Sequence, residues 1–438
     1  MEKNHSRISY FPTDGLTYDP SDSKYWNQEA LDKEIERTFE ICHGCRMCFK
    51  YCDSFPTLFN LIDNNYDGDV KKIKPEDTNR IMDECFQCKL CEVQCPYTVR
   101  DGHEFKLDFP KLVHRHKAIR SKSKPKNLRD KLLGNPDKSA QMARASLGIA
   151  NLINRLSIPR WFMEKIVGIH RKKILPDFSF STFEQWASKF GLIRKNQKAE
   201  TVLFQTCYVQ HNEPQIGKDT LEVLNKNKVD CACVKGLRCC GMPAWEQGDL
   251  ETLRNNAKHN LDILIPFVEK GSKILVINPT CSMMMRREYT DLLDGEDRER
   301  AKKLSESVND PSEYLWNIRN EDRFNTDIKS IPNEKISYHA PCHLRAQGIG
   351  FKGRDLIKKI TGSKVKTVME CCGHDGTYAM KVESFDASKR IGQKSFDGMK
   401  AEETEIWATD CPLAALQFKQ HAGVKPKHPM SVLADAYR

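Results

Sequence analysis

Two runs of cysteine near the start of the chain have a spacing that suits iron–sulfur chemistry. Each run follows the pattern C-x2-C-x2-C-x3-C, and Pro96 comes directly after the second. The runs are Cys42, Cys45, Cys48 and Cys52, then Cys85, Cys88, Cys91 and Cys95. Iron is held in clusters by soft thiolates, and three cysteines on one tight loop can hold three corners of a cube. The longer x3 spacing carries the last cysteine of each run away from the other three.

This spacing, which is that of bacterial two-cluster ferredoxins, predicts two 4Fe–4S clusters that exchange their fourth ligands. The first cluster would be held by Cys42, Cys45, Cys48 and Cys95. The second would be held by Cys85, Cys88, Cys91 and Cys52. Structural zinc is the alternative, but zinc takes its four ligands as two separated pairs. Asp53 follows Cys52 where a proline is usual, and this departure removes no ligand.

A second group of cysteines lies in the C-terminal half, where each follows a strand-like run. The expected strands are residues 201–206, 229–234 and 273–278, then 335–339, 364–369 and 405–409. The cysteines that follow them are Cys207, Cys239, Cys240 and Cys281, then Cys342, Cys371, Cys372 and Cys411. Equivalent cysteines are 135, 132 and 130 residues apart, which indicates an internal duplication. Cys231 and Cys233 alternate along an expected strand and are expected to pack in the core.

Helical patterns lie between these expected strands, for example at residues 216–224, 250–268 and 354–360. Strand–helix–strand order predicts two α/β units with short parallel sheets. Sites in such sheets form at the carboxyl ends of the strands, which is where the cysteines fall. Gly241 and Gly373 allow the tight turn that lets adjacent cysteines converge.

Basic residues are concentrated between the two cysteine regions. The 438-residue chain has a formal net charge of +10, and residues 111–200 hold 21 lysines and arginines against 6 aspartates and glutamates, with no cysteine. Such a stretch is either a solvated helical connector or a contact for an anionic membrane or an acidic partner. No zinc-finger, RNP or basic-zipper pattern accompanies it, so we expect no nucleic-acid partner.

The chain is therefore expected to be a multidomain protein of the α+β and α/β classes. We expect an N-terminal extension at residues 1–34 and a helical, ferredoxin-like module with two clusters at 35–110. A basic helical connector follows at 111–199, and two tandem, duplicated α/β domains follow at 200–325 and 326–438. No apolar run approaches the roughly 20 residues of a membrane span, and the N-terminus has no secretory signal. Eighteen cysteines in such a chain indicate metal or redox roles in the reducing cytoplasm.

The cysteine patterns resemble those of a known family. Cys207-x31-Cys239-Cys240-Gly241-x39-Cys281, and its second copy, look like the paired cysteine-rich "CCG" domains found in one subunit of heterodisulfide reductase. With the ferredoxin-like module in front, the chain resembles the iron–sulfur subunits of anaerobic glycerol-3-phosphate dehydrogenase and of glycolate oxidase. HRKKILPDFSFSTF at residues 170–183, NEPQIGKD at 212–219, HAPCH at 339–343 and CCGHDGTY at 371–378 strengthen the first of these matches.

The resemblance implies one further iron–sulfur centre in each CCG domain, held by its four cysteines. The fullest form of the motif ends in C-x-x-C, but Met284 and Ala414 stand at its last position here. Each site therefore keeps four thiolates, which suffice for one cluster. His339, His343 and His374 lie beside these cysteines and either ligate iron or donate hydrogen bonds at the site, and we favour the second role.

By this resemblance, the chain would be the iron–sulfur electron-transfer subunit of a respiratory oxidoreductase. Electrons would come from a flavoprotein dehydrogenase of the glycerol-3-phosphate or 2-hydroxy-acid type and reach a quinone-level or other acceptor. The nominal G-x-G-x-x-G of Gly348, Gly350 and Gly353 does not follow its strand directly, so a partner must supply the flavin or nicotinamide chemistry. No catalytic residue is identified, since no Ser/His/Asp, phosphate-loop or paired-carboxylate pattern is visible.

A second interpretation of the resemblance is a heterodisulfide-reductase-like enzyme. The segment at residues 41–59 is closer to a heterodisulfide-reductase-related branch that is often encoded beside rubrerythrin, a peroxide-scavenging iron protein. In that case a CCG site itself reduces a disulfide, or serves a peroxide-linked reaction. The partners encoded beside the chain would discriminate between the two interpretations.

Residues 141–169 combine apolar and basic positions at near-helical spacing. The apolar pattern is carried by Leu147, Ile149, Leu152, Ile153 and Leu156. The basic residues that flank it are Arg144, Arg155, Arg160, Lys165 and residues 171–173. This segment either lies in the interface of an anionic membrane, with its basic residues on lipid headgroups, or packs on the CCG domains. We expect a cytoplasmic protein, with peripheral attachment to the cytoplasmic face of the inner membrane in the first case.

Overall fold

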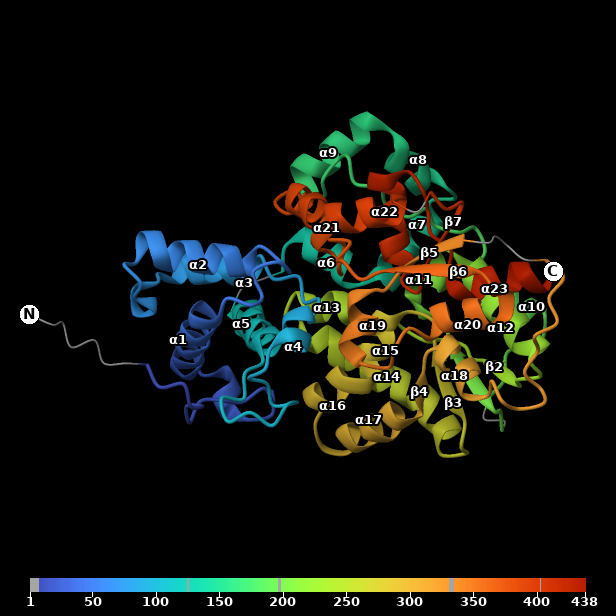
Figure 1. The fold of residues 1–438 in the computed structure, drawn as a ribbon, viewed down its shortest axis with the longest axis horizontal. Coiled ribbons are helices and arrows are strands. Elements are labelled where there is room, and N and C mark those ends of the chain that lie inside the picture. The colour runs from blue at the N-terminus through green and yellow to red at the C-terminus, as the bar shows by residue number, and fades with distance from the viewer. Residues whose placement is uncertain (1–7, 124–125, 196–197, 331–334, 402) are drawn as a thin grey trace, which may run out of the picture. The chain divides into compact units, whose positions relative to one another are not determined.

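The computed structural model describes residues 8–123, 126–195, 198–330, 335–401 and 403–438. It divides into two compact units (Figure 1). Unit 1 comprises residues 1–126 and the short segment Trp245–Asp249, and unit 2 comprises Asn127–Ala244 and Leu250–Arg438. Among the described residues, no helix combines the length and the apolar character that crossing a bilayer requires.

Unit 1 is built from helices joined by cysteine-bearing loops. Its elements are η1 (Ser23–Trp26), α1 (Gln28–Cys45), α2 (Ser54–Asn65), η2 (Val70–Lys72), α3 (Pro75–Asp83), α4 (Leu90–Gln94) and α5 (Phe109–Ser123). Helix α1 begins where the side chain of Asn27 accepts a hydrogen bond from the Ala30 amide, and it ends at Arg46, whose φ is 55°. Leu31, Ile35 and Phe39 recur at helical spacing and form its buried face.

Two buried arginines hold the N-terminal segment in place. The Arg115 guanidinium donates to the carbonyl oxygens of Gly15 and Tyr25, each at 2.8 Å. The Arg37 guanidinium is paired with the buried carboxylate of Glu34 at 2.6 Å and donates to the Tyr10 carbonyl at 2.8 Å. A guanidinium carries five donors in a fixed fork, so one side chain can satisfy several backbone carbonyls at once.

The chain returns to unit 1 for a few residues in the middle of unit 2's sequence. Helix α13 (Met242–Glu246) begins in unit 2, and the segment Trp245–Asp249 belongs to unit 1. The Trp245 indole is fully buried and stacks on the His114 ring, with 5.1 Å between centroids and 19° between planes. The Lys89 ammonium lies 5.4 Å from the Trp245 ring centroid, and an ammonium over an aromatic face is attracted to it.

Unit 2 begins with short helices formed by the basic stretch. They are α6 (Leu128–Gly134), α7 (Pro136–Ala145), α8 (Ile149–Arg155), α9 (Ser157–Val167) and α10 (Phe183–Lys189). Helix α10 starts with a capping box, in which the side chains of Thr182 and Gln185 bond each other's backbone amides. The basic stretch is thus helical, as the sequence predicts.

The rest of unit 2 is two α/β repeats with parallel sheets. The first repeat contains β1 (Thr201–Phe204), α11 (Thr206–His211), α12 (Pro214–Lys226), β2 (Cys231–Cys233), α14 (Leu250–Val268), β3 (Lys273–Val276), α15 (Pro279–Met283), the π-helical turn η3 (Met284–Glu288), α16 (Tyr289–Leu292), α17 (Gly295–Ser307), β4 (Val308–Asn309) and α18 (Pro311–Asn317). The second contains β5 (Lys335–His339), α19 (Cys342–Gln347), α20 (Lys352–Thr361), β6 (Lys364–Val368), η4 (Tyr378–Met380), α21 (Phe385–Lys400), β7 (Ile406–Thr409), α22 (Pro412–Ala422) and α23 (Pro429–Tyr437).

The strand order is the same in both repeats. The sheets run β2-β1-β3-β4 and β6-β5-β7, and every pair of neighbouring strands is parallel. Equivalent strands therefore occupy equivalent places, with β1 and β5 at the centres. This arrangement confirms the predicted fold class of two duplicated α/β domains behind a helical module. The sequence reasoning missed β4, a two-residue strand at the edge of the first sheet.

One apolar core joins the two repeats. Helix α23 packs on α12 and α20, and α20 also packs on α18, so helices of one repeat contact helices of the other (Figure 1). The core includes Leu203 from β1, Leu275 from β3 and Tyr338 from β5. All four residues of β1 are buried, as expected for a parallel strand covered on both faces. Cys233 lies in this core and Cys231 packs against it, in agreement with a packing role for both.

Replacement of Trp245 tests whether the returning segment stabilises unit 1. We expect Trp245→Ala to destabilise unit 1 by about 3–5 kcal/mol, because a large buried side chain is lost and a cavity remains. Amide hydrogen exchange in α5, which carries His114, reports the change as a loss of protection. Trp161→Ala is the control, because the Trp161 side chain is half-exposed and its loss should change stability by less than about 0.5 kcal/mol. Equal protection of α5 in Trp245→Ala and the wild type would contradict this role.

Candidate metal centres

The first group of cysteines in unit 1 combines the first run with the last cysteine of the second. Cys42 and Cys45 end α1, and the left-handed turn at Arg46 brings Cys48 back toward them. Cys95, the residue that ends α4, joins this group. The sulfurs of Cys48, Cys95 and Cys45 lie near that of Cys42, since each of them raises the pKa of Cys42 by electrostatic repulsion. All four line one cavity of about 30 Å³, together with apolar side chains such as Phe55 and Leu107.

The second group combines the second run with Cys52. Cys88, Cys85 and Cys52 each raise the pKa of Cys91 by electrostatic repulsion, and Cys85 does the same to Cys52. These four sulfurs are therefore neighbours. Two residues with positive φ, Gln87 at 64° and Lys89 at 60°, turn the loop between Cys85 and Cys91. The structure thus brings together the two sets of four that crossed ligation requires. Cys48 of the first group also raises the pKa of Cys91, so the two groups are neighbours within unit 1.

Burial sets the acid–base state of these sulfurs. Burial, and then the neighbouring Cys48, Cys95 and Cys45, raise the pKa of Cys42 well above its ordinary value. Burial also raises the pKa of Cys48 to about 12. Four thiolates cannot share such a site unless a positive charge lies among them. Metal ions supply that charge, and their binding releases the thiol protons.

Buried lysines lie beside the second group. The Lys117 ammonium donates to the Cys85 carbonyl oxygen at 2.9 Å, and both Lys117 and Lys89 are buried. Nearby net charge is one of the factors that set the potential of an iron–sulfur centre. Lys117 thus supplies positive charge next to a site whose ligands are negative.

In unit 2, each CCG cysteine lies at the carboxyl end of a parallel strand. Cys207 is in α11 after β1, Cys281 is in α15 after β3, and Cys239 and Cys240 precede α13 after β2. The four sulfurs influence one another's pKa in sequence, Cys207 with Cys239, Cys239 with Cys240 and Cys240 with Cys281, so they are close neighbours. The first CCG set is therefore a continuous group of four sulfur atoms.

Glycine makes the turn at each pair of adjacent cysteines possible. Gly241 has φ of 89° and Gly373 has φ of 71°, in the left-handed region that side chains disfavour. A Cβ atom at Gly373 would lie 2.1 Å from the Ser388 carbonyl oxygen. Any other residue at this position would have to displace the backbone of α21.

The second CCG set is arranged differently. Cys371 and Cys411 lie near Cys372 and raise its pKa. The Cys342 thiol instead donates a hydrogen bond to Oδ2 of Asp375, at 3.6 Å. Burial raises the pKa of Cys371 to about 12, and it raises that of Cys411 to about 11 against the lowering effect of the Ala414 and Leu413 amides. Cys342 thus has a carboxylate oxygen beside its sulfur, whereas the sulfurs of the first set lie next to one another.

The three histidines of this region are buried. The His339 ring bonds Thr409 Oγ1 and the Glu370 carbonyl oxygen, each at 3.1 Å, and burial lowers its pKa to about 4. Burial also lowers the pKa of His374 well below the usual value. His343 lies 3.5 Å from Asp375 Oδ2, measured from Nε2. His339 and His374 are therefore neutral groups beside the cysteines.

Both CCG sets line one cavity of about 80 Å³. Its lining includes Cys207, Cys239, Cys240 and Cys281 of the first repeat and Cys342, Cys372 and Cys411 of the second. His339, His343, His374 and Asp375 line it as well. The duplication thus brings the strand ends of both repeats to a common space within unit 2.

Sequence reasoning missed three charged residues at these sites. Asp137 of α7 accepts a hydrogen bond from the Cys239 amide at 2.6 Å, and Asp375 contacts Cys342. Lys173 is buried near Cys372, and burial lowers its pKa to about 8. Asp137 and Lys173 come from the connector, far from the cysteines in sequence, so no spacing pattern could indicate them. Asp375 stands out only when the two repeats are aligned with each other.

The donor atoms fit iron–sulfur centres. Three of the four sets are grouped sulfur atoms alone, and soft thiolates are the ligands that such clusters take. Cys42, Cys45, Cys48 and Cys95 would hold one cluster, and Cys85, Cys88, Cys91 and Cys52 another. When bound, such clusters supply one-electron transfer.

Comparison with protein-family models agrees with this interpretation. Residues 41–100 match the model described as a 4Fe–4S dicluster domain. Residues 201–286 and 336–419 each match the model described as a cysteine-rich domain, named CCG. The predicted iron–sulfur chemistry is confirmed at the level of these domains, while the number of clusters and the ligand sets stay predictions.

This chain aligns with most of the length of several known proteins. The anaerobic glycerol-3-phosphate dehydrogenase of Escherichia coli has a subunit, designated C, that is 26% identical over 413 residues, which are 92% of this chain and 99% of that protein. Lactate utilization protein A 2 of Bacillus cereus and lactate utilization protein A 1 of Bacillus anthracis are each 30% identical over 210 residues, which are 47% of this chain and 83% of each relative. The chain therefore belongs to the family of iron–sulfur proteins with paired cysteine-rich CCG domains, to which these relatives belong.

Proposed function

We propose that this chain is the electron-transfer subunit of an oxidoreductase. It would accept electrons from a flavoprotein dehydrogenase of the glycerol-3-phosphate or 2-hydroxy-acid type and deliver them to a quinone-level acceptor. The observation that carries this proposal is the crossed grouping in unit 1, where Cys52 lies with the second run and Cys95 with the first. That grouping provides two neighbouring four-sulfur sites in one unit, of which the first is partly buried and the second buried.

The residues around these sites have roles that suit this function. Apolar side chains such as Phe55 and Leu107 exclude water from the first site. The buried ammonium group of Lys117, which bonds the Cys85 carbonyl oxygen, favours added negative charge at the second. In unit 2, Lys173 places a cation close to Cys372. Each of these residues acts by adjusting the charge or the polarity next to a thiolate site.

The relatives support the choice of partner. One is named as a subunit of anaerobic glycerol-3-phosphate dehydrogenase, and others are named for lactate utilization, lactate being a 2-hydroxy acid. We infer by analogy that a flavoprotein dehydrogenase binds this chain and carries out the substrate chemistry. The alternative, a thiol/disulfide or peroxide-linked reductase, is favoured by one observation, the cavity that both CCG sets line.

We also propose peripheral attachment of unit 2 to an anionic membrane surface. Helices α8 and α9 expose a set of apolar side chains, and no residue of α8 is buried. The exposed set is Leu147, Ile149, Leu152, Ile153, Leu156, Ile158, Trp161, Phe162 and Ile166. Isolated exposed apolar residues are ordinary, but a contiguous set marks an interaction surface. A quinone acceptor dissolved in the bilayer would make this location useful.

Not every basic residue of this segment is available to lipid. Arg160 is buried and donates to the carbonyl oxygens of His170 and Lys173, at 2.7 and 2.8 Å. Lys173 is itself buried. The expectation that both contact headgroups is therefore wrong, because these side chains hold the loop after α9. Lys165 and Lys172 are exposed basic residues of this segment. Arg155 and Arg171 are exposed too and pair with Asp177 and Glu164, while Arg144 donates to Gln185.

Serine variants test the crossed ligand sets. Cys52→Ser should alter the same EPR signal as Cys85→Ser, and Cys95→Ser the same signal as Cys42→Ser, because each pair lies in one group. Anaerobically purified wild type should contain at least about eight irons per chain from these two clusters. A Cys52→Ser variant that loses the signal removed by Cys42→Ser would refute the crossed assignment.

Substrate-dependent bleaching tests the electron-transfer function. The chain should be purified anaerobically together with the flavoprotein encoded beside it, and glycerol 3-phosphate or lactate should then bleach its visible absorbance. Cys88→Ser should abolish part of this bleaching, since it removes a ligand of one cluster. Bleaching by neither compound, with rapid reoxidation of the reduced protein by an organic disulfide or peroxide, would favour the alternative function.

Liposome flotation tests the membrane proposal. Ile158→Glu should reduce flotation with anionic liposomes at low salt by at least about tenfold, because it places a charge on the apolar surface. Phe190→Glu is the matched control: Phe190 is 61% exposed, against 72% for Ile158, and lies outside the exposed set. Failure of the wild-type protein to float at low salt would refute the proposal.

A further inference from the structure

The two CCG repeats differ in the residues that surround their cysteines. The offsets of 135 and 132 residues identify which positions are equivalent. Four positions that are apolar or neutral in the first repeat carry histidine or aspartate in the second: Phe204 and His339, Tyr208 and His343, Met242 and His374, Pro243 and Asp375. The strand order is the same in both repeats, so this difference concerns side chains on a common backbone.

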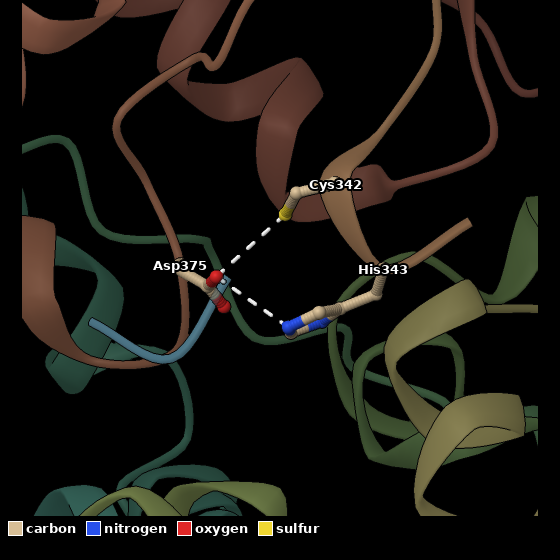
Figure 2. A group of neighbouring side chains, drawn as sticks. All are labelled: Cys342, His343 and Asp375. Carbon is tan, nitrogen blue, oxygen red and sulfur yellow. Dashed lines mark hydrogen bonds and ion pairs between the residues drawn. The ribbon is translucent and has the colours of Figure 1, made fainter. Parts of the chain in front are cut away.

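Three side chains of the second repeat converge on one point (Figure 2). Asp375 Oδ2 lies 3.6 Å from the Cys342 sulfur and 3.5 Å from Nε2 of His343. One donor atom from each residue lies within 4.8 Å of the other two. The side chains of His343 and Asp375 are 2% and 3% exposed, so the site is shielded from bulk water.

An ordinary ion pair explains this arrangement less well. A charge-assisted hydrogen bond between imidazolium and carboxylate has a length of about 2.7–2.9 Å, and 3.5 Å is clearly longer. The Cys342 thiol donates a hydrogen bond to Asp375 Oδ2 at 3.6 Å, and a metal ion would take the place of that thiol proton. A positive charge among the three donors would let Cys342 bind as a thiolate next to the carboxylate.

Two of the three donor–donor distances match the edges of a tetrahedron around a single metal ion. With metal–sulfur bonds of about 2.3 Å and metal–oxygen bonds of about 2.0–2.2 Å, a sulfur and an oxygen on one tetrahedral ion lie roughly 3.5–3.7 Å apart. A nitrogen and an oxygen on such an ion lie roughly 3.3–3.5 Å apart. The observed 3.6 and 3.5 Å agree with both.

We infer that Cys342, His343 and Asp375 bind one divalent transition-metal ion as a mixed sulfur, nitrogen and oxygen site. A thiolate, an imidazole and a carboxylate suit zinc or ferrous iron, and two negative ligands balance the charge of a divalent ion. The thiol proton of Cys342 leaves to solvent on binding. The inference shares with the proposed function only the expectation that the second CCG domain holds a metal centre. It assigns Cys342 to a different centre from the other three cysteines of its set.

A residue of the first repeat orients the histidine. The Thr280 hydroxyl forms a hydrogen bond of 2.9 Å with Nδ1 of His343, and Thr280 is adjacent to Cys281. A metal-binding histidine commonly uses its second ring nitrogen in this way, which fixes the ring and directs the other nitrogen to the ion. Thr280 is therefore a positioning residue that makes the mixed site depend on both repeats. Cys342, His343 and Asp375 all line the cavity that both CCG sets share.

Zinc titration of the full-length protein tests the inference. Anaerobically purified protein that keeps its iron–sulfur clusters is washed with EDTA and titrated with Zn²⁺, and the bound zinc is examined by X-ray absorption. We expect one tight site with sulfur and lighter ligands together. Asp375→Asn, which preserves size, should weaken zinc binding by at least about tenfold without changing cluster iron, and Asp375→Cys should retain zinc with one more sulfur ligand.

A buried carboxylate elsewhere in unit 2 provides the control. Asp219 is buried and paired with Arg438 at 2.6 Å, so Asp219→Asn should leave zinc binding unchanged. Thr280→Val should weaken binding and disorder the nitrogen ligand in the absorption spectrum, which a merely structural role would not do. Wild-type affinity in Asp375→Asn, zinc bound by sulfur alone, or a wild type without a tight site would each overturn the inference. These readouts are independent of substrate-dependent bleaching, so they remain interpretable if the proposed function fails.

Discussion

Close-packed thiol groups in water-poor surroundings are the constraint on which the rest of the structure depends. Burial disfavours each thiolate, and neighbouring sulfurs disfavour it further. The cysteines of the folded chain can therefore ionise together only when cations lie among them. Much of the local structure serves this arrangement. The left-handed residues Arg46 and Lys89 turn the loops of unit 1, and Gly241 and Gly373 turn those of unit 2. Lysines stand where they offset part of the remaining charge.

The fold could be predicted largely because its signals are local and repeated. Three strands, each followed by a cysteine, occur in each of two copies. This pattern implies two parallel sheets with the same connectivity, and the structure has them. Strand β4 escaped prediction because two residues at a sheet edge carry no periodicity. The grouping of Cys52 with the second run follows from spacing alone. Asp137 and Lys173 could not be predicted, because only tertiary packing brings the connector to the cysteines. Their positions depend on how helices pack, and the sequence of the connector gives no pattern for that.

The duplicated sheets show how one backbone can carry two chemistries. The strands and turns that place the cysteines are the same in both repeats, while the residues beside them have changed from apolar or neutral to ionisable. Because Thr280 of the first repeat forms a hydrogen bond with His343 of the second, the orientation of the His343 ring depends on both repeats. The shared core between α12, α20 and α23 provides the rigid support for this dependence.

The segment Trp245–Asp249 constrains how such proteins can be rearranged in evolution. Unit 1 needs a tryptophan that is encoded within the coding region of unit 2, between the paired cysteines of the first repeat and α14. A gene fission or fusion at the connector would separate the ferredoxin-like module from the side chain that fills its interior. Recombination that treats the two units as independent cassettes would therefore yield a module with a hole where Trp245 stacks on His114. Inheritance of the two units as one reading frame is the arrangement that this single indole ring favours.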